Sequence, residues 1–178
     1  MLRKAGVLAF LMLAVLAANV APATAQTPPP TTSSDCPKTE VDTTAFLSGP
    51  MIVGTAPRGL VRLAVVNDEN GRARGLMCVT RVPHGEGMIF VFTPPDADQN
   101  FWMKDTLVPL DMVFVHGDGV VDSVAVNVPA TKNGTPDDKV ARRGGVGRFV
   151  IEFGAGDAAR LGIKPGTKIV LPPLVAKG

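Results

Sequence analysis

Short runs of apolar and β-branched residues alternate with glycine- and proline-containing segments along most of this chain. Runs of this length and composition are typical of β-strands, and the breaks between them are typical of turns. The pattern predicts strands at 60–66, 87–92, 99–104, 110–115, 120–128, 149–153 and 168–171. It also predicts short helices at 69–77 and 157–161, the first weakened by Gly71 and Gly75.

These elements predict a mainly β fold with short helices (α+β), built on a compact, mostly antiparallel sheet that is barrel-like or sandwich-like. Both helices are too short for a doubly wound parallel fold. The polar segment 129–147 separates two predicted strands. Loops of that length without regular structure are usually functional or mobile, so we expect this one to cover a site as a lid.

The first 25 residues have the pattern of a secretory signal peptide. Arg3 and Lys4 precede an apolar run, and Ala23-Thr24-Ala25 matches a cleavage site. The run is shorter than the ~20 residues of a membrane-spanning helix, so we expect no transmembrane anchor after cleavage. The predicted organisation is a signal peptide at 1–25, a Pro/Thr-rich tether at 26–48, one β-rich domain at 49–172 and a tail at 173–178. The expected location is periplasmic or secreted.

The charge and the scarce metal-binding residues exclude several kinds of partner. Removing Arg3 and Lys4 with the signal peptide lowers the formal net charge from +2 to zero, which leaves 16 acidic residues and an equal number of basic ones. Such a protein has no electrostatic reason to bind nucleic acid. The two cysteines and two histidines lack metal-site spacing, so neither a metal nor a cofactor is predicted.

Cys36 and Cys78 are the only cysteines of the chain. Disulfides persist in exported proteins. A bond between these two would close a loop of about forty residues and stabilise the fold by roughly 4 kcal/mol. It would also attach the tether to the domain. Two unpaired thiols are the alternative.

The run from Phe101 to Asp111 holds the only tryptophan, Trp102, and the lysine closest to it, Lys104. On a strand these two side chains would share one face. The indole would then form one wall of a pocket in which the ammonium binds an anionic or hydroxyl-rich ligand. The alternative is that Trp102 is part of the core and Lys104 extends into water.

Arg74 and Asp111 are the supporting candidates, each with a structural alternative. Arg74 could bind a carboxylate through two hydrogen bonds, or it could be a structural ion-pair partner. Asp111 could pair with Arg74 or Lys104, or it could cap a turn through nearby backbone groups.

Several sequence blocks occur together and in a fixed order. They are Arg74-Gly75-Leu76-Met77, the segment 85–92, the run 101–111, Val150-Ile151-Glu152 and the segment 161–166. With these blocks, from Leu60 to Leu171, the chain resembles the domain of unknown function 192 family of small, often exported bacterial and archaeal proteins. The resemblance implies a compact β-rich fold and no established activity, substrate or cofactor. Asp105 stands where many relatives carry asparagine, and Cys78 fits a bridge particular to exported members.

Three functions are consistent with these features, and an enzyme is not the favoured one. The first is an exported domain that binds a small polar or anionic ligand or a cell-envelope partner through Trp102 and Lys104, with Arg74 and Asp111 supporting. The second is a hydrolase of envelope saccharide or peptide that uses Glu86 and Asp111 as acid and base and Lys104 as an electrostatic stabiliser. The third is a structural scaffold in which the same motif packs the core.

Overall fold

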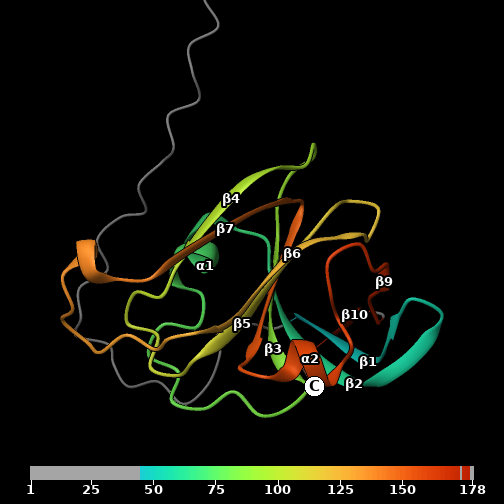
Figure 1. Cartoon of the computed structure of the whole chain (residues 1–178), viewed down its shortest axis with the longest axis horizontal. Helices are drawn as coiled ribbons and strands as arrows, with labels where there is room; N and C mark the ends of the chain where they lie inside the picture. The colour runs from blue at the N-terminus through green and yellow to red at the C-terminus, as the bar shows by residue number, and fades with distance from the viewer. Residues whose placement is uncertain (1–44, 173, 177–178) are drawn as a thin grey trace, which may run out of the picture.

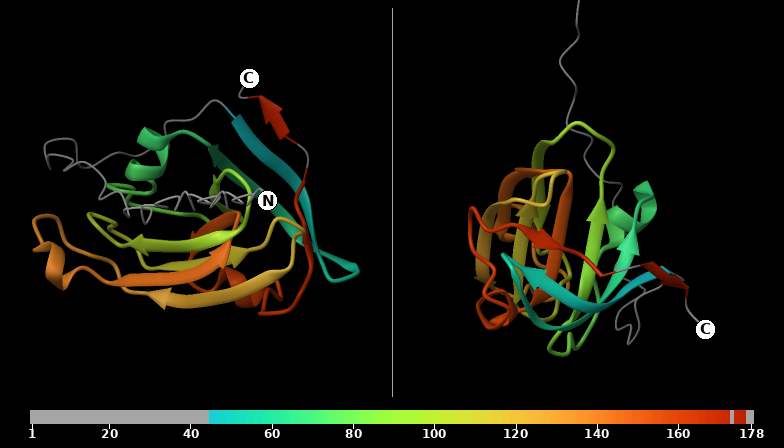
Figure 2. Two further views of the ribbon diagram at one scale, coloured as in Figure 1. Left: turned by 90° about the horizontal axis from the view of Figure 1, so that it is seen from above. Right: turned by 90° about the vertical axis from the view of Figure 1, so that its right-hand side faces the viewer.

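A strongly curved β-sheet forms most of the protein, in a computed structural model that describes residues 45–172 and 174–176 (Figures 1 and 2). The strands are β1 (Ala45–Val53), β2 (Ala56–Val66), β3 (Glu86–Val91), β4 (Ala97–Trp102), β5 (Leu110–Val115), β6 (Val121–Val128), β7 (Arg142–Gly147), β8 (Phe149–Gly154), β9 (Ile169–Val170) and β10 (Leu174–Ala176). The helices are α1 (Glu69–Arg74), the 3-10 turn η2 (Asp137–Lys139) and α2 (Asp157–Arg160).

The main sheet has eight strands in the order β10-β1-β2-β3-β8-β5-β6, with β9 paired to β1. Strands β4 and β7 form a separate two-stranded ribbon. Only β2 and β3 pair in parallel, joined through α1, whereas the other pairs among the described residues are antiparallel. The predicted mainly β fold with short helices and a mostly antiparallel sheet is therefore confirmed.

Helix α1 begins and ends at residues that its sequence marks. The Asp68 carboxylate accepts a hydrogen bond from the Gly71 backbone N–H at 2.9 Å and caps the first turn. The helix ends at Gly75, whose positive φ of 48° favours glycine. This ending places the next residues, 76–79, in the core.

The sheet is covered on both faces, because side chains alternate along each strand. Met88, Phe90 and Met112 belong to the core on the face covered by α1 and the β4–β7 ribbon. Ile89, Val113 and other residues on the opposite face pack with Ala158 and Leu161 of the α2 region. Every residue of β5 is buried, which explains why Leu110–Val115 is apolar except for Asp111.

The structure differs from the sequence-based predictions in the segment 129–147. Strand β7 falls inside the segment 129–147 that was predicted to be a structureless loop, so that prediction is wrong for 142–147. Its Gly145 lies so close to Phe114 that a Cβ there would come within 2.8 Å of the Phe114 Cβ. The glycines that suggested a loop therefore allow tight packing of a strand.

The sheet also extends beyond the predicted domain bounds of 49–172, because β1 begins at Ala45 and β10 spans Leu174–Ala176. The predicted signal peptide, nearly all of the tether and Cys36 lie outside the described residues. No helix within the described ranges is both long enough and apolar enough to cross a membrane.

Candidate functional site

A small pocket of about 30 Å³ lies on the face of the sheet that carries α1. It is lined by α1 and the turn after it, by Phe90, by Phe101 and Trp102 at the end of β4, by Thr106, and by Glu152 of β8. We call it the Glu152 pocket. Two of the predicted site residues, Arg74 and Trp102, line it together.

Glu152 is brought to the lining of this pocket by the register of three strands. It lies on β8 directly between Met88 of β3 and Met112 of β5. Both neighbours are apolar and buried, and Glu152 itself is only 4% exposed. Burial raises the pKa of the Glu152 carboxyl from 4.5 to about 8, because the charged form loses its hydration.

At neutral pH the Glu152 carboxyl is therefore mostly protonated and can both donate and accept a hydrogen bond. Within the described part of the chain, no hydrogen bond or ion pair reaches it. Gly75 allows the turn after α1 to pass nearby, since a Cβ there would lie 3.9 Å from Glu152 Oε2 and 3.3 Å from the Phe90 ring. The carboxyl thus faces a pocket that the backbone approaches closely.

Aromatic rings make the pocket wall rigid. The Phe101 ring stands edge-on to Phe90, with centroids 4.8 Å apart, and it contacts Phe92 and Phe114 in the same way at 6.2 Å. These arrangements are the favoured geometry for aromatic pairs. The guanidinium carbon of Arg142 lies over the Trp102 ring, 4.9 Å from the ring centroid.

The two arginines of the pocket differ in how they are held. The Arg72 guanidinium donates to the backbone carbonyls of Asn67 at 2.7 Å and Val91 at 3.3 Å, so it is structural. Arg74 ends α1 and is half-buried, and no described residue forms an ion pair or side-chain hydrogen bond with its guanidinium. Arg74 is therefore the cation of this pocket that remains available to a ligand.

Comparison with sequence models of known protein families shows to which family the chain belongs. The sequence model of DUF192, described as "Uncharacterized ACR", matches residues 52–171. The chain belongs to the DUF192 family. The resemblance found in the sequence blocks is thereby confirmed, and the family brings no established activity.

Two solved structures share the fold of this DUF192 protein. A protein from Sinorhizobium meliloti 1021, described as a "putative transcription regulator", is 27% identical with a TM-score of 0.59, over 74% of this chain and 97% of that one. A protein of unknown function from Novosphingobium aromaticivorans DSM 12444 is 31% identical with a TM-score of 0.58, over 78% of this chain and 94% of that one. No curated protein shows significant sequence similarity to the chain.

Lys104 of this DUF192 domain lies outside the Glu152 pocket. Strand β4 ends at Trp102, so the strand alternation that was predicted to bring Trp102 and Lys104 to one face does not extend to Lys104. The Lys104 ammonium instead donates to the Asp137 carboxylate at 2.6 Å and to the Thr135 carbonyl at 3.3 Å. The hydrogen bond that Lys104 donates to the Asp137 carboxylate raises the pKa of Lys104, against the opposing effect of burial.

The segment 129–147 is therefore tied to Lys104, and no residue of it lines the Glu152 pocket. It does not have the position of the predicted lid over this pocket. Beside Lys104, Asp105 is buried with a positive φ of 46°, and its Oδ1 has no hydrogen-bond partner among the described residues. Asp105 does not line the pocket either.

Asp111 has the structural role that was one of its two predicted alternatives. One carboxylate oxygen accepts the Asn127 backbone N–H at 2.8 Å, and the other accepts those of Gly156 at 2.9 Å and Ala158 at 3.0 Å. The side chain is 1% exposed. Its three hydrogen bonds join β5 to β6 and to the start of α2, so Asp111 faces away from the Glu152 pocket.

The pair proposed for hydrolysis is separated by the sheet. Glu86 lies on β3 in alternation with Met88 and Phe90, on the face of the Glu152 pocket. Asp111 alternates on β5 with Val113 and Val115, on the opposite face. Two carboxyl groups on opposite faces cannot act on the same glycosidic bond. Among the described residues no group of three or more His, Cys, Asp or Glu side chains is placed to hold a metal ion.

The sequence-based analysis of this DUF192 domain missed Glu152 as a site residue. A signal was present, because Glu152 is the only charged residue in the apolar run Phe149–Phe153. On a buried strand it must point to the same face as Val150, into the core. A lone carboxyl in an apolar strand is a candidate functional group for that reason.

Proposed function

We propose that this protein is an exported, non-enzymatic domain that binds a small polar ligand, or a polar group of a cell-envelope component, in the Glu152 pocket. The observation that carries the proposal is the buried Glu152 carboxyl, which lines a pocket and has no partner in the described part of the chain. Arg74 and Trp102 supply the cation and the aromatic wall.

The energetic argument is that an unpaired buried polar group is costly. Leaving such a group without a hydrogen bond costs about 1–3 kcal/mol, and more when it is charged. Met88 and Met112, its apolar strand neighbours, supply no hydrogen bond to the carboxyl, so within the described part of the chain its oxygens face only the pocket. A ligand that hydrogen-bonds to it would remove that cost, which supports a binding role.

The pocket also restricts the ligand. A cavity of about 30 Å³ admits only a group of the size of one or two water molecules, such as an amino, hydroxyl or amide end group. That group would meet Glu152, while an anionic part of the ligand would remain near Arg74 at the rim. Amino acids, short peptides and amino sugars have this combination of groups.

Trp102 provides a direct test of binding, because it is the only tryptophan and it lines the pocket. We expect one class in a panel of amino acids, cell-wall sugars and small anions to change its fluorescence in a saturable way. Glu152→Gln is expected to weaken that binding at least tenfold, because a hydrogen bond to a charged group is worth about 1.5–3 kcal/mol and each 1.4 kcal/mol corresponds to about a factor of ten. The titration is run at pH 9, where the native carboxyl is mostly charged and the glutamine amide is not.

Matched variants separate binding from folding. Arg74→Gln is expected to weaken binding, whereas Arg143→Gln, an exposed arginine outside the pocket, is expected to have no effect. Melting temperatures at the same pH show whether each variant is folded. If a ligand binds equally well to the Glu152→Gln and Arg74→Gln variants, the proposed site is wrong.

Export and the predicted disulfide are tested together on protein recovered from cells. We expect the mature chain to begin near Gln26, and we expect non-reducing peptide mapping to recover a peptide in which Cys36 is joined to Cys78. Reduction is expected to lower the free energy of unfolding by roughly 4 kcal/mol, because the loop of about forty residues is released. Recovery of the intact chain from the cytoplasm with both thiols free to react would contradict export.

A further inference from the structure

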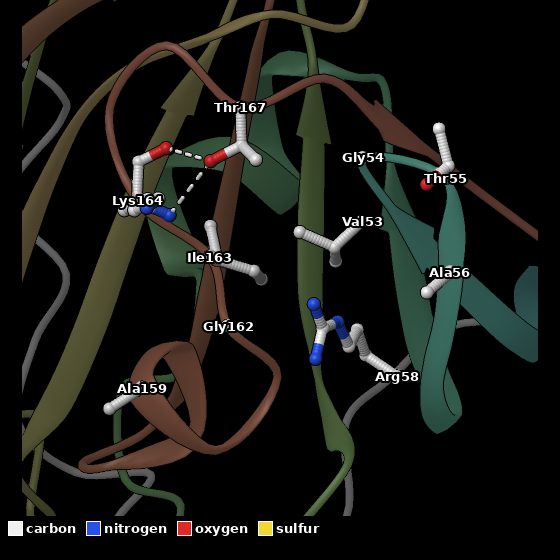
Figure 3. A pocket seen from close by; sticks show the side chains of 10 residues that line it. All are labelled: Val53, Gly54, Thr55, Ala56, Arg58, Ala159, Gly162, Ile163, Lys164 and Thr167. Carbon is white, nitrogen blue, oxygen red and sulfur yellow. Dashed lines mark hydrogen bonds between the residues drawn. The ribbon is translucent and has the colours of Figure 1, made fainter.

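A second, larger cavity lies on the other side of the molecule from the Glu152 pocket, beside the β1–β2 hairpin. Its volume is about 540 Å³, within the roughly 300–1,000 Å³ of small-molecule sites. One wall is the hairpin from Val53 to Arg58, and the other is the segment from Ala159 to Thr167 (Figure 3). We call it the hairpin groove.

The floor of the hairpin groove is apolar and rigid. Val53 is 3% exposed and Ile163 is 5% exposed, and both belong to the core on that face of the sheet. Figure 3 shows their side chains between the hairpin and the 162–167 segment. A ligand seated here would rest its apolar part on groups that the core already holds in place.

Two cations, Arg58 and Lys164, line the groove together with no acidic residue. Neither side chain has an ion-pair or hydrogen-bond partner in the part of the chain that the structure describes. In Figure 3 the Arg58 guanidinium extends toward the opposite wall. Its Nε lies over Gly162, 3.6 Å from the position a Cβ would take there.

The backbone of Lys164 is held by its own turn. The Lys164 backbone N–H donates to the Thr167 hydroxyl at 3.2 Å, and that hydroxyl donates back to the Lys164 carbonyl. The turn therefore holds the lysine at the edge of the groove opposite Arg58. Arg58 and Lys164 therefore line the groove from two separate walls.

We propose that the hairpin groove binds an organic anion, a carboxylate or phosphate group carried on a short apolar chain. The anionic group would accept charge-assisted hydrogen bonds from Arg58 and Lys164. The apolar chain would lie on Val53 and Ile163. Two cations on a mature chain of zero net charge are too few for a nucleic-acid surface, which favours a small anion.

The test uses hexanoate and hexyl phosphate as probes, because each carries both an anionic group and a short apolar chain. Acetate and inorganic phosphate carry the anion alone, and hexylamine carries the chain with the opposite charge. Binding is followed by amide shifts in nuclear magnetic resonance. We expect shifts at Gly54, Ala56 and Gly162 with hexanoate or hexyl phosphate, and no shift of the Trp102 indole N–H, which reports on the Glu152 pocket.

Charge-matched variants identify the groups that bind. The double variant Arg58→Gln/Lys164→Gln is expected to lose at least about tenfold in affinity. The double variant Arg81→Gln/Lys132→Gln removes the same charge from exposed positions outside the groove and is expected to bind as the native protein does. Ala56→Phe places a ring in the groove without changing the charge and is expected to block binding.

Four binding results with the native protein would overturn the proposal. They are no binding of either complete probe, equal binding of inorganic phosphate and hexyl phosphate, equal binding of hexylamine, or binding only to vesicles of anionic lipid. Equal affinity in the two double variants would also overturn it. None of these results bears on the Glu152 pocket, because Trp102 fluorescence reads that site separately.

Discussion

Replacing Asp111 by alanine is expected to lower the free energy of unfolding by about 2–5 kcal/mol, since one buried and two partly buried backbone N–H groups lose their acceptor, and a buried group left unpaired costs about 1–3 kcal/mol. These are the N–H groups of Asn127, Gly156 and Ala158. Because typical domains are stable by only about 5–15 kcal/mol, the variant is expected to lose a large share of its stability.

Chemical denaturation measures this loss, with Asp118→Ala as the matched control. The Asp118 carboxylate also accepts a backbone N–H, that of Val120 at 2.9 Å, but in an exposed turn. Water can replace that acceptor, so the control is expected to lose less than about 1 kcal/mol. Asp111→Asn keeps one suitable oxygen and is expected to fall between the two. Equal stability of both alanine variants would show that Asp111 does not hold β6 and α2.

Replacing Glu152 by glutamine is expected to stabilise the protein above pH 8 by a few kcal/mol. Burial raises the pKa of the Glu152 carboxyl to about 8 in the folded protein, against 4.5 for the ordinary value. Between these two pH values the folded state binds more protons than the unfolded state. The free energy of unfolding of the native protein therefore falls as the pH rises from about 4.5 to about 8.

Glutamine has a similar shape and carries no charge at any pH, so the variant loses this dependence. The stability difference between variant and native protein is expected to be small near pH 4.5, to grow up to pH 8 and to stay constant above it. Urea denaturation at pH 5, 7 and 9 measures that difference. Glu86→Gln, on the same face of the sheet but half-buried, is the control and is expected to keep the fall seen in the native protein.

A difference that does not change with pH would contradict the burial of an ionisable Glu152. The expected result also sharpens the functional test. If Glu152→Gln is more stable and yet binds no ligand, the loss of binding cannot be attributed to unfolding. A group that lowers stability at physiological pH and is needed for binding is the usual pattern at functional sites.

Local sequence was sufficient for most of the fold, because most strands carry their own pattern. The apolar run Leu110–Val115 is β5 with the predicted bounds. Asp68 and Gly75 mark the ends of α1 through local hydrogen bonding and a positive φ. The strand β7 had no such pattern, because its arginines and glycines pair with β4 and pack against the sheet only in the folded protein.

The candidate site was only partly predictable for the same reason. Arg74 and Trp102 line one pocket, but sequence could not place Lys104 beyond the end of β4 or show that Asp137, far along the chain, would bind it. Sequence also could not show that Glu86 and Asp111 lie on opposite faces. Such facts depend on strand order and register, which are set by contacts between distant segments.

The amino-acid sequence by itself determined the mainly β class, the family blocks and most strand positions, because alternation, turn residues and caps act over a few neighbours. Only the tertiary structure decided which face each polar side chain occupies and which side chains share a cavity. The buried Glu152 carboxyl between Met88 and Met112 is the clearest case. Its environment consists of residues from other strands, so its raised pKa and its lack of a partner among the described residues exist only in the folded sheet.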